Sequence, residues 1–180
     1  MAGVWYGGRM SRPAFADAFA HHVWATLRLV DACLALSAEQ LRTTVPGTYG
    51  SILETMRHLV VGDSSYLIAM TGKRSPLVDE DQMDLPGLRI AMERHGVAWS
   101  RLLARALDPD EIFHERGDDG FERDAPMGIG LAQALQHGND HRSQICTALT
   151  TLGVDPPSID VWDFGLQAGR VVERLPGRTP

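Results

Sequence analysis

Two histidines four residues apart carry the clearest chemical signal in this 180-residue sequence. His137 and His141 lie in Gln136-His-Gly-Asn-Asp-His-Arg-Ser-Gln144, within a helical pattern from about Gly128 to Leu152. Side chains four apart on a helix share one face, with Cβ atoms about 5–6 Å apart. Both imidazoles can therefore bind one metal ion, although two core histidines that are simply hydrogen-bonded can have the same spacing.

A third histidine would favour the metal, and His58 supplies a candidate. The face that carries His137 and His141 is otherwise mostly small or apolar, which predicts that both rings point inward; its other members are Ala134, Gln144, Ile145, Ala148 and Leu152. A buried polar group without a hydrogen bond or metal costs about 1–3 kcal/mol, so inward-pointing rings need partners. His58 lies in a second helical pattern, which begins with the capping box Ser51/Glu54 and runs to about Met70 before Gly72.

Two segments of the sequence, in this order, resemble the DinB-like proteins of the DinB/YfiT group. They are Gly50-Ser-Ile-Leu-Glu-Thr-Met-Arg-His58-Leu59 and Leu135-Gln-His-Gly-Asn-Asp-His-Arg-Ser-Gln-Ile145. The second segment is similar to that family's His-x3-His-Arg-x-Gln signature, and the resemblance covers about Pro13 to Arg170. It implies a metal-binding four-helix bundle in which His58, His137 and His141 are the three metal ligands.

Several polar side chains near these histidines are candidates for supporting roles. Glu54, one turn before His58, is expected mainly to cap its helix and alternatively to orient the imidazole. Ser65 and Tyr66 are candidate pocket residues beside His58, and Gln144 is a candidate for binding a metal-held water or substrate. Arg142 is expected off the ligand face. Four further histidines, which we expect to be solvated or hydrogen-bonded, have no assigned role: His21, His22, His95 and His114.

The composition indicates one soluble globular domain, spanning residues 1–180 with a core bundle of about 12–153 and an extension at 154–180. Apolar residues make up 44% of the chain, charged residues 22%, and the net charge of −6 argues against a nucleic-acid partner. No apolar run is long enough for a membrane span, and residues 1–10 lack signal-peptide features. The cytoplasm is the expected location. Cys33 and Cys146 do not form a secreted disulfide framework.

Periodicity and turn signals predict helices along most of the chain, and the resemblance implies that they form an all-α, up-down four-helix bundle of the DinB/YfiT type. The first helix is expected from the Ser11-Arg-Pro13 cap to about Leu36. The third is expected from Gly87 to about Leu107, with Trp99 at the core edge, His95 at the surface, and inward candidates that include Ile90, Val97, Leu102 and Leu103. An acidic loop precedes the third helix. A hairpin or ordered loop at 112–124, around Asp119-Gly120, is expected near one end of the bundle, where it would cover a metal cavity. A short helix capped by Ser158 and containing Trp162 is expected to pack on the bundle or in a homodimer contact.

Three histidines leave at least one open position on a zinc-like ion, and open positions are typical of catalytic sites. The ion expected is one divalent metal: zinc, nickel, manganese or iron. Gly138 follows the first histidine where a zinc protease needs glutamate. The resemblance implies a metal-dependent transferase that joins a low-molecular-weight thiol to a small electrophile in detoxification or stress response. The alternatives are a non-catalytic metal-binding protein and a metal-dependent hydrolase.

Overall fold

Four long helices form a bundle, and a two-stranded hairpin precedes the last of them. The computed structural model describes residues 13, 15–73, 82–116 and 120–174. The elements are α1 (Ala16–Cys33), α2 (Ala38–Leu41), α3 (Ile52–Thr71), α4 (Leu85–Leu103), β1 (Ile112–Arg116), β2 (Glu122–Pro126), α5 (Met127–Thr151) and α6 (Val161–Gln167). The predicted all-α bundle, with a hairpin before its last long helix and a short C-terminal helix, is confirmed.

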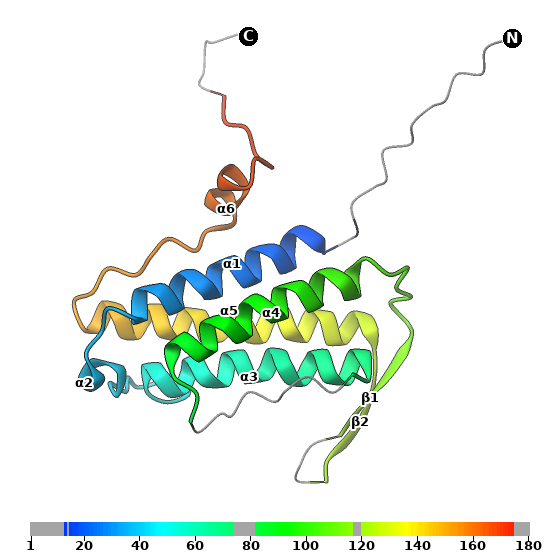
Figure 1. Cartoon of the computed structure of the whole chain (residues 1–180), viewed down its shortest axis with the longest axis horizontal. Helices are drawn as coiled ribbons and strands as arrows, with labels where there is room; N and C mark the ends of the chain where they lie inside the picture. The colour runs from blue at the N-terminus through cyan, green and yellow to red at the C-terminus, as the bar shows by residue number, and fades with distance from the viewer. Residues whose placement is uncertain (1–12, 14, 74–81, 117–119, 175–180) are drawn as a thin grey trace, which may run out of the picture.

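The four long helices pack around a common axis, each against two neighbours. α1 lies against α4 and α5, and α3 lies against the same two helices from the other side. Figure 1 shows that α3 and α4 run in the same direction, while α1 and α5 run the opposite way. α3 and α5 are therefore antiparallel neighbours, which places the middle of one beside the middle of the other.

The ends of α3 and α5 follow the signals in the sequence. Ser51 Oγ accepts a hydrogen bond from the Glu54 backbone N–H, and Glu54 Oε2 accepts one from the Ser51 N–H, so the predicted capping box is present. Gly72 ends α3 with φ +63°, and Gly153 follows α5 with φ +72°. Left-handed backbone of this kind favours glycine and stops a helix.

Other helix ends differ from the prediction. α1 begins at Ala16 after Phe15, whose φ of +65° interrupts the helix, so Pro13 precedes the helix instead of lying in its first turn. Ser11, the expected cap, lies outside the described residues. α1 also ends at Cys33, three residues early. α4 begins at Leu85 because the Asp84 side chain accepts from the Gly87 N–H, and it ends at Leu103. Asp160, not Ser158, caps α6.

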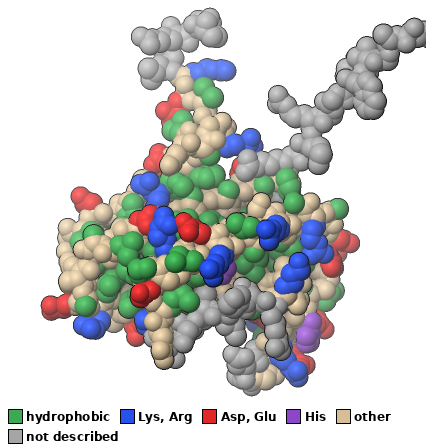
Figure 2. Space-filling model, in the orientation of Figure 1, with side chains coloured by type: hydrophobic (Ala, Val, Ile, Leu, Met, Phe, Trp, Pro, Cys, Tyr) green, Lys and Arg blue, Asp and Glu red, His purple; other side chains and the backbone are tan. Residues whose placement is uncertain are grey.

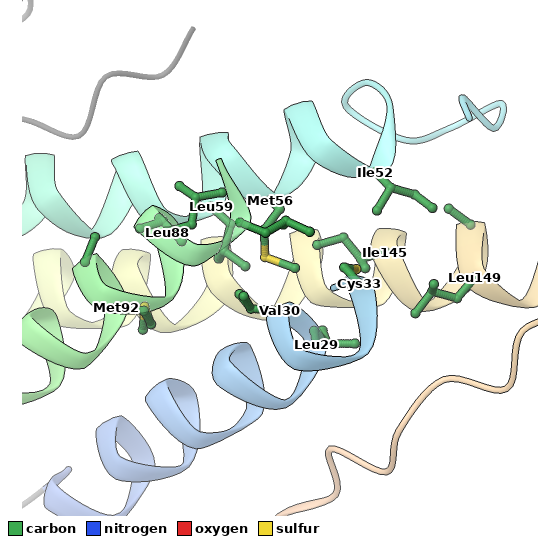
Figure 3. Close-up of a cluster of buried hydrophobic side chains, with 14 residues drawn as sticks. Leu29, Val30, Cys33, Ile52, Met56, Leu59, Leu88, Met92, Ile145 and Leu149 are labelled. Carbon is green, nitrogen blue, oxygen red and sulfur yellow. The ribbon is translucent and has the colours of Figure 1, made fainter. Parts of the chain in front are cut away.

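Apolar side chains from all four long helices fill the bundle in two clusters. One of them surrounds Met56, Leu88 and Ile145 (Figure 3); the other surrounds Phe19, Trp99 and Leu131. Trp99 is 1% exposed, so its expected place at the core edge was wrong. Ile90 and Val97 are 50% and 52% exposed, and their predicted inward positions were also wrong. The inward face of α4 is instead formed by Leu85, Leu88, Met92, His95, Trp99 and Leu102.

The hairpin pairs β1 with β2 from Ile112 opposite Pro126 to Arg116 opposite Glu122. Gly120 has φ +84°; Asp119 and the acidic run 79–81 lie outside the described residues. Phe113 is the buried residue of β1, and a Cβ at Gly130 would lie 2.6 Å from its ring. The hairpin therefore packs on the first turns of α5, about two turns before His137, rather than directly against the histidine pair.

Charged side chains of both signs are interspersed with apolar ones on the face seen in Figure 2. None of the helices within the described ranges is long and apolar enough to cross a membrane.

Candidate metal centre

His58, His137 and His141 lie together between α3 and α5. Each offers a ring nitrogen, and these atoms all lie within 4.8 Å of one another. The ring centroids are 5.1 Å apart for His58 and His137, 4.8 Å for His58 and His141, and 4.5 Å for His137 and His141. The group, which contains no other histidine, cysteine or acidic residue from the described segments, joins two stretches that are about 80 residues apart in sequence.

A glycine on α3 makes room for one of the rings. A Cβ at Gly62, one turn after His58, would lie 2.4 Å from His137 Cε1 and 3.1 Å from His137 Nε2. Such distances are well inside van der Waals contact, so any side chain at Gly62 would displace the imidazole. The absence of a side chain at Gly62 thus leaves the space on this face of α3 that the His137 ring occupies.

His137 has the chemistry of a metal ligand. Its Nδ1 is buried and has no hydrogen-bond partner among the described residues. Burial, together with smaller effects of the nearby His141 and His58, lowers the pKa of His137 to about 4. The ring is therefore neutral at physiological pH and can donate a lone pair.

His141 is held by hydrogen bonding in a definite orientation. Its Nδ1–H donates to Gln144 Oε1 at 3.2 Å, and the Tyr49 backbone N–H donates to the same oxygen at 2.9 Å. Because Nδ1 carries the proton, the Nε2 lone pair is left for a ligand bond. Burial lowers the pKa of His141, against the opposing effect of the Gln144 hydrogen bond.

Two tyrosines flank the three histidines. The Tyr49 ring stacks on His58 with 3.9 Å between centroids, and it meets His141 edge-on at 5.6 Å. Tyr66 meets His137 edge-on at 5.5 Å and accepts a hydrogen bond from Gln133 Nε2 at 3.2 Å. Tyr66 was expected as a pocket wall. Tyr49 was missed, because it precedes α3 in a loop where periodicity gives no signal.

The remaining expected pocket residues divide between the site and the surface. Gln144 lies in the site, through its bonds to His141 and Tyr49. Glu54 is exposed, and its side chain is hydrogen-bonded to Ser51 in the capping box, which is the role mainly expected of it. Ser65 is exposed, and its hydroxyl donates to the Val61 carbonyl one turn back on α3.

The geometry of the three rings fits a small divalent ion after a modest closure. Zinc bonds nitrogen at about 2.0–2.1 Å, which places tetrahedral ligand atoms roughly 3.4 Å apart. Nitrogens within 4.8 Å of one another can reach this spacing by ring rotation, with the pair that is farthest apart closing by up to about 1.4 Å. The unpartnered Nδ1 of His137 supports the fit, because a buried nitrogen without a partner is otherwise costly.

A buried polar network lies beside the site, and sequence reasoning missed it. His22 Nε2–H donates to both Asp63 carboxylate oxygens at 2.9 and 3.0 Å, and Trp99 Nε1–H donates to Asp63 Oδ2 at 3.1 Å. Arg142 Nη1–H donates to His22 Nδ1 at 2.8 Å. Asp63 and His22 are fully buried, and the four residues come from four different helices. Arg142 does lie off the ligand face, as expected.

Burial, charge and hydrogen bonding act against each other on Asp63. Burial alone would raise its pKa, but the charge and hydrogen bonds of His22, with smaller effects of His95 and Trp99, leave the pKa below its ordinary value. Asp63 is therefore an anion inside the bundle, and His22 links it by hydrogen bonds to Arg142.

The other unassigned histidines are hydrogen-bonded outside the triad. His21 Nε2–H donates to the Ile159 carbonyl at 2.8 Å. His95, expected at the surface, is 4% exposed, and its Nε2 is hydrogen-bonded to Ser64 Oγ at 2.8 Å. His114 lies exposed in β1, where Nδ1–H donates to Asp124 across the hairpin. Cys33 is buried and Cys146 is half-buried, both as free thiols.

Comparisons with known proteins agree with this architecture. The model of the DinB family matches residues 10–171. The crystal structure of a DinB-like protein from Bacillus cereus is similar with a TM-score of 0.64 and 19% identity, covering 83% of this chain and 99% of that one. At this identity the likeness establishes the fold. No curated protein matched the sequence.

Proposed function

Because the chain belongs to the DinB family, we propose that it binds one divalent metal ion through His58, His137 and His141. The observation that carries the proposal is the meeting of three imidazoles from two helices, with ring nitrogens within 4.8 Å of one another. Burial keeps His137 and His141 neutral, and Gln144 orients His141 with Nε2 available. Zinc, nickel, manganese and ferrous iron all accept imidazole ligands.

We further propose that the site serves a thiol transferase. A bound divalent metal lowers the pKa of a thiol or water that it holds. The thiol sulfur would then form a bond to the electrophilic carbon of a small substrate while the bond from that carbon to its leaving group breaks, and the thiol proton would leave to solvent. Within the protein, Tyr49 and Tyr66 would border the substrate, and Gln144 would hold His141 in position. The family resemblance is what favours a thiol over water.

A specific observation favours a second candidate, a metal-binding protein without catalysis. Two cavities in the described part of the molecule lie between α1 and α4 and between α1, α5 and α6, and neither is lined by the three histidines. Tyr49 also stacks directly on His58. A metal held under this ring would have little room for a bulky cosubstrate. Metal-assisted hydrolysis by a bound hydroxide needs less space and is the third candidate.

Elemental analysis of the purified protein, with variants, tests the metal site. We expect about one divalent ion per chain in the parent protein and in His114→Ala, whose histidine is exposed on the hairpin. His58→Ala and His141→Ala should lose stoichiometric metal while they retain cooperative thermal unfolding. Full metal occupancy in either of these two variants would refute the ligand assignment.

Titration of the cobalt-loaded protein with low-molecular-weight thiols separates the candidate functions. A thiolate-to-cobalt absorption band that saturates with bacillithiol, mycothiol or glutathione supports the transferase. Metal binding without any such band moves the assignment to the non-catalytic protein or the hydrolase. Turnover of an activated ester by the zinc form, without thiol, distinguishes these last two.

A further inference from the structure

A second cavity, with a volume of about 700 Å³, lies between α1, α5 and the C-terminal segment that carries α6. Pockets of about 300–1,000 Å³ are typical of small-molecule sites in proteins. Apolar and aromatic side chains form part of its walls, with Leu135, Trp162 and Phe164 among them. The polar part of the lining includes Arg142, His22 and the Asp17–Arg170 ion pair, in which the carboxylate is already matched by a cation. The lining therefore offers an apolar surface for an aromatic ring and a cation, Arg142, beside it.

This cavity is separate from the histidine triad. On α5, Leu135, Asn139 and Arg142 line the cavity, and at about 100° per residue they lie on the side of the helix away from His137 and His141. Gly138 confirms the direction, since a Cβ there would lie 2.3 Å from His22 on α1. The helix α5 therefore has one face toward the triad and another toward the cavity.

Hydrogen bonds and ring contacts hold the outer wall in place. Trp24 Nε1–H donates to Gln167 Oε1 at 2.9 Å, and the Trp24 ring packs on Phe164 with 5.6 Å between centroids. Arg28 Nε–H donates to the Ser158 carbonyl at 2.9 Å, and Arg170 pairs with Asp17 at 3.0 Å. Figure 1 shows α6 above α1, on the side away from the rest of the bundle, and Figure 2 shows hydrophobic side chains where this segment meets the bundle.

Arg142 is incompletely satisfied in its buried position. It is 3% exposed, and its hydrogen bonds to the described residues all use Nη1, which donates to His22 Nδ1, to Thr26 Oγ1 at 3.3 Å and to the His22 carbonyl at 3.5 Å. Its Nε is buried without a partner among the residues described. Asp63, the nearby carboxylate, is bonded to His22 rather than to the guanidinium. A buried guanidinium with an unused donor is suited to a carboxylate or sulfonate.

We propose that this cavity binds a small aromatic acid, with its anionic group directed to Arg142 and its ring against Leu135, Trp162 and Phe164. The geometry gives each part of such a ligand a counterpart: the apolar walls cover the ring, and the Arg142 guanidinium, turning slightly about its Nη1 bonds, offers Nε–H to the anion. The site is independent of the metal centre, and its test is separate from that of the proposed function.

Fluorescence titration with two matched dyes tests the proposal. The anionic probe is 1-anilinonaphthalene-8-sulfonate, and the neutral control is N-phenyl-1-naphthylamine, which has the same rings without the sulfonate. We expect saturable binding of about one anionic dye per chain, with the neutral dye at least about tenfold weaker, the effect of one charge-assisted hydrogen bond. Equal affinity for the two dyes would overturn anion recognition.

Three variants locate the site. Arg142→Gln should weaken the anionic dye at least about tenfold and leave the neutral dye unchanged. Leu135→Trp, which fills the cavity without altering the arginine, should block both dyes, and Arg101→Gln at the end of α4 is the matched control that should bind as the parent does. If Arg142→Gln fails to unfold cooperatively, Leu135→Trp and the dye pair decide. Dye binding that survives Leu135→Trp would refute the site. Dye binding that is lost at the protein concentrations at which size-exclusion chromatography shows a dimer dissociating would also refute it.

Discussion

Replacing Gly62 by alanine should abolish tight metal binding without unfolding the bundle. The added methyl would lie 2.4 Å from His137 Cε1, 3.0 Å from Nδ1 and 3.1 Å from Nε2. Carbon atoms in contact are normally about 3.5–4.0 Å apart, so the imidazole has to retreat by more than about 1 Å. Ligand atoms in a metal site tolerate errors of about 0.2 Å, so His137 would no longer reach an ion held by His58 and His141.

The effect on stability should be small because two contributions oppose each other. Alanine in a helix interior is about 1 kcal/mol more favourable than glycine, while overpacking costs about 1–3 kcal/mol. The metal-free variant should therefore lose no more than about 2 kcal/mol. Loss of one of three ligands should weaken metal binding by more than about 100-fold, since even residues that only support a ligand contribute 10- to 100-fold.

Competition with a chromophoric chelator measures the metal affinity, and chemical denaturation of the metal-free protein measures the stability. Gly96→Ala is the matched control: Gly96 is also inside a helix, but its nearest side chain is Val23 at 3.0 Å, on α1 and away from the triad. A Gly62→Ala protein that binds metal as tightly as Gly96→Ala would show that His137 is not a ligand in the observed arrangement.

Two further predictions concern the buried network. Asp63→Asn should lower the free energy of unfolding by about 3–5 kcal/mol in denaturant titrations, because it removes the buried carboxylate charge to which His22 and Trp99 donate and which acts electrostatically on the buried Arg142; a loss under about 1 kcal/mol would contradict an ionic network. His95 is the pH-dependent element: burial lowers its pKa, against the opposing effect of Asp63 and with a smaller lowering by His22. A histidine whose folded pKa is depressed stabilises above its unfolded pKa of about 6.5, and that stability is lost as pH falls. Below about pH 6.5 the unfolding free energy of the parent protein should therefore fall more steeply than that of His95→Gln, and parallel curves would rule this out.

The pairing of His137 with His141 could be predicted because its signal is local, whereas the family resemblance added His58 as the third member of the triad. His137 and His141 are spaced by one helical turn, and the capping box at Ser51 fixes where α3 begins and hence which way His58 points. Gly62, one turn after His58, leaves the space that His137 fills. The inferences from spacing and from capping each use residues within one helix.

The positions predicted wrongly on α4 could have been assigned correctly from the spacing of its residues, although not from hydrophobicity alone. Leu88, Met92, His95, Trp99 and Leu102 recur at steps of three and four and form the buried face. Choosing Ile90 and Val97 because they are apolar placed the inward face on the wrong side and moved His95 to the surface. A histidine in phase with a tryptophan on an otherwise apolar stripe indicates burial, and its partner, Ser64, lies on another helix.

The network of His22, Asp63, Trp99 and Arg142 could not be derived in this way, because no two of its members share a helix. Periodicity can show that each side chain points inward, but it gives neither the height of one helix against another nor which polar groups meet. Tyr49 is similar, since its position over His58 depends on a loop conformation fixed by its backbone bond to Gln144.

The network and the metal centre constrain each other through α5. Within little more than one turn, His137 and His141 face α3 while Gly138 and Arg142 face α1, where a Cβ at Gly138 would collide with His22. The bond from Arg142 to His22, and that from His22 to Asp63 on α3, therefore fix the height of α5 against both helices. A slip of one residue along α5, about 1.5 Å, would break these bonds and also carry both ring nitrogens away from His58. Loss of metal in a network variant can thus arise from displacement of the helix alone, whereas Gly62→Ala acts on the ligand with the network intact, and only the latter bears directly on coordination.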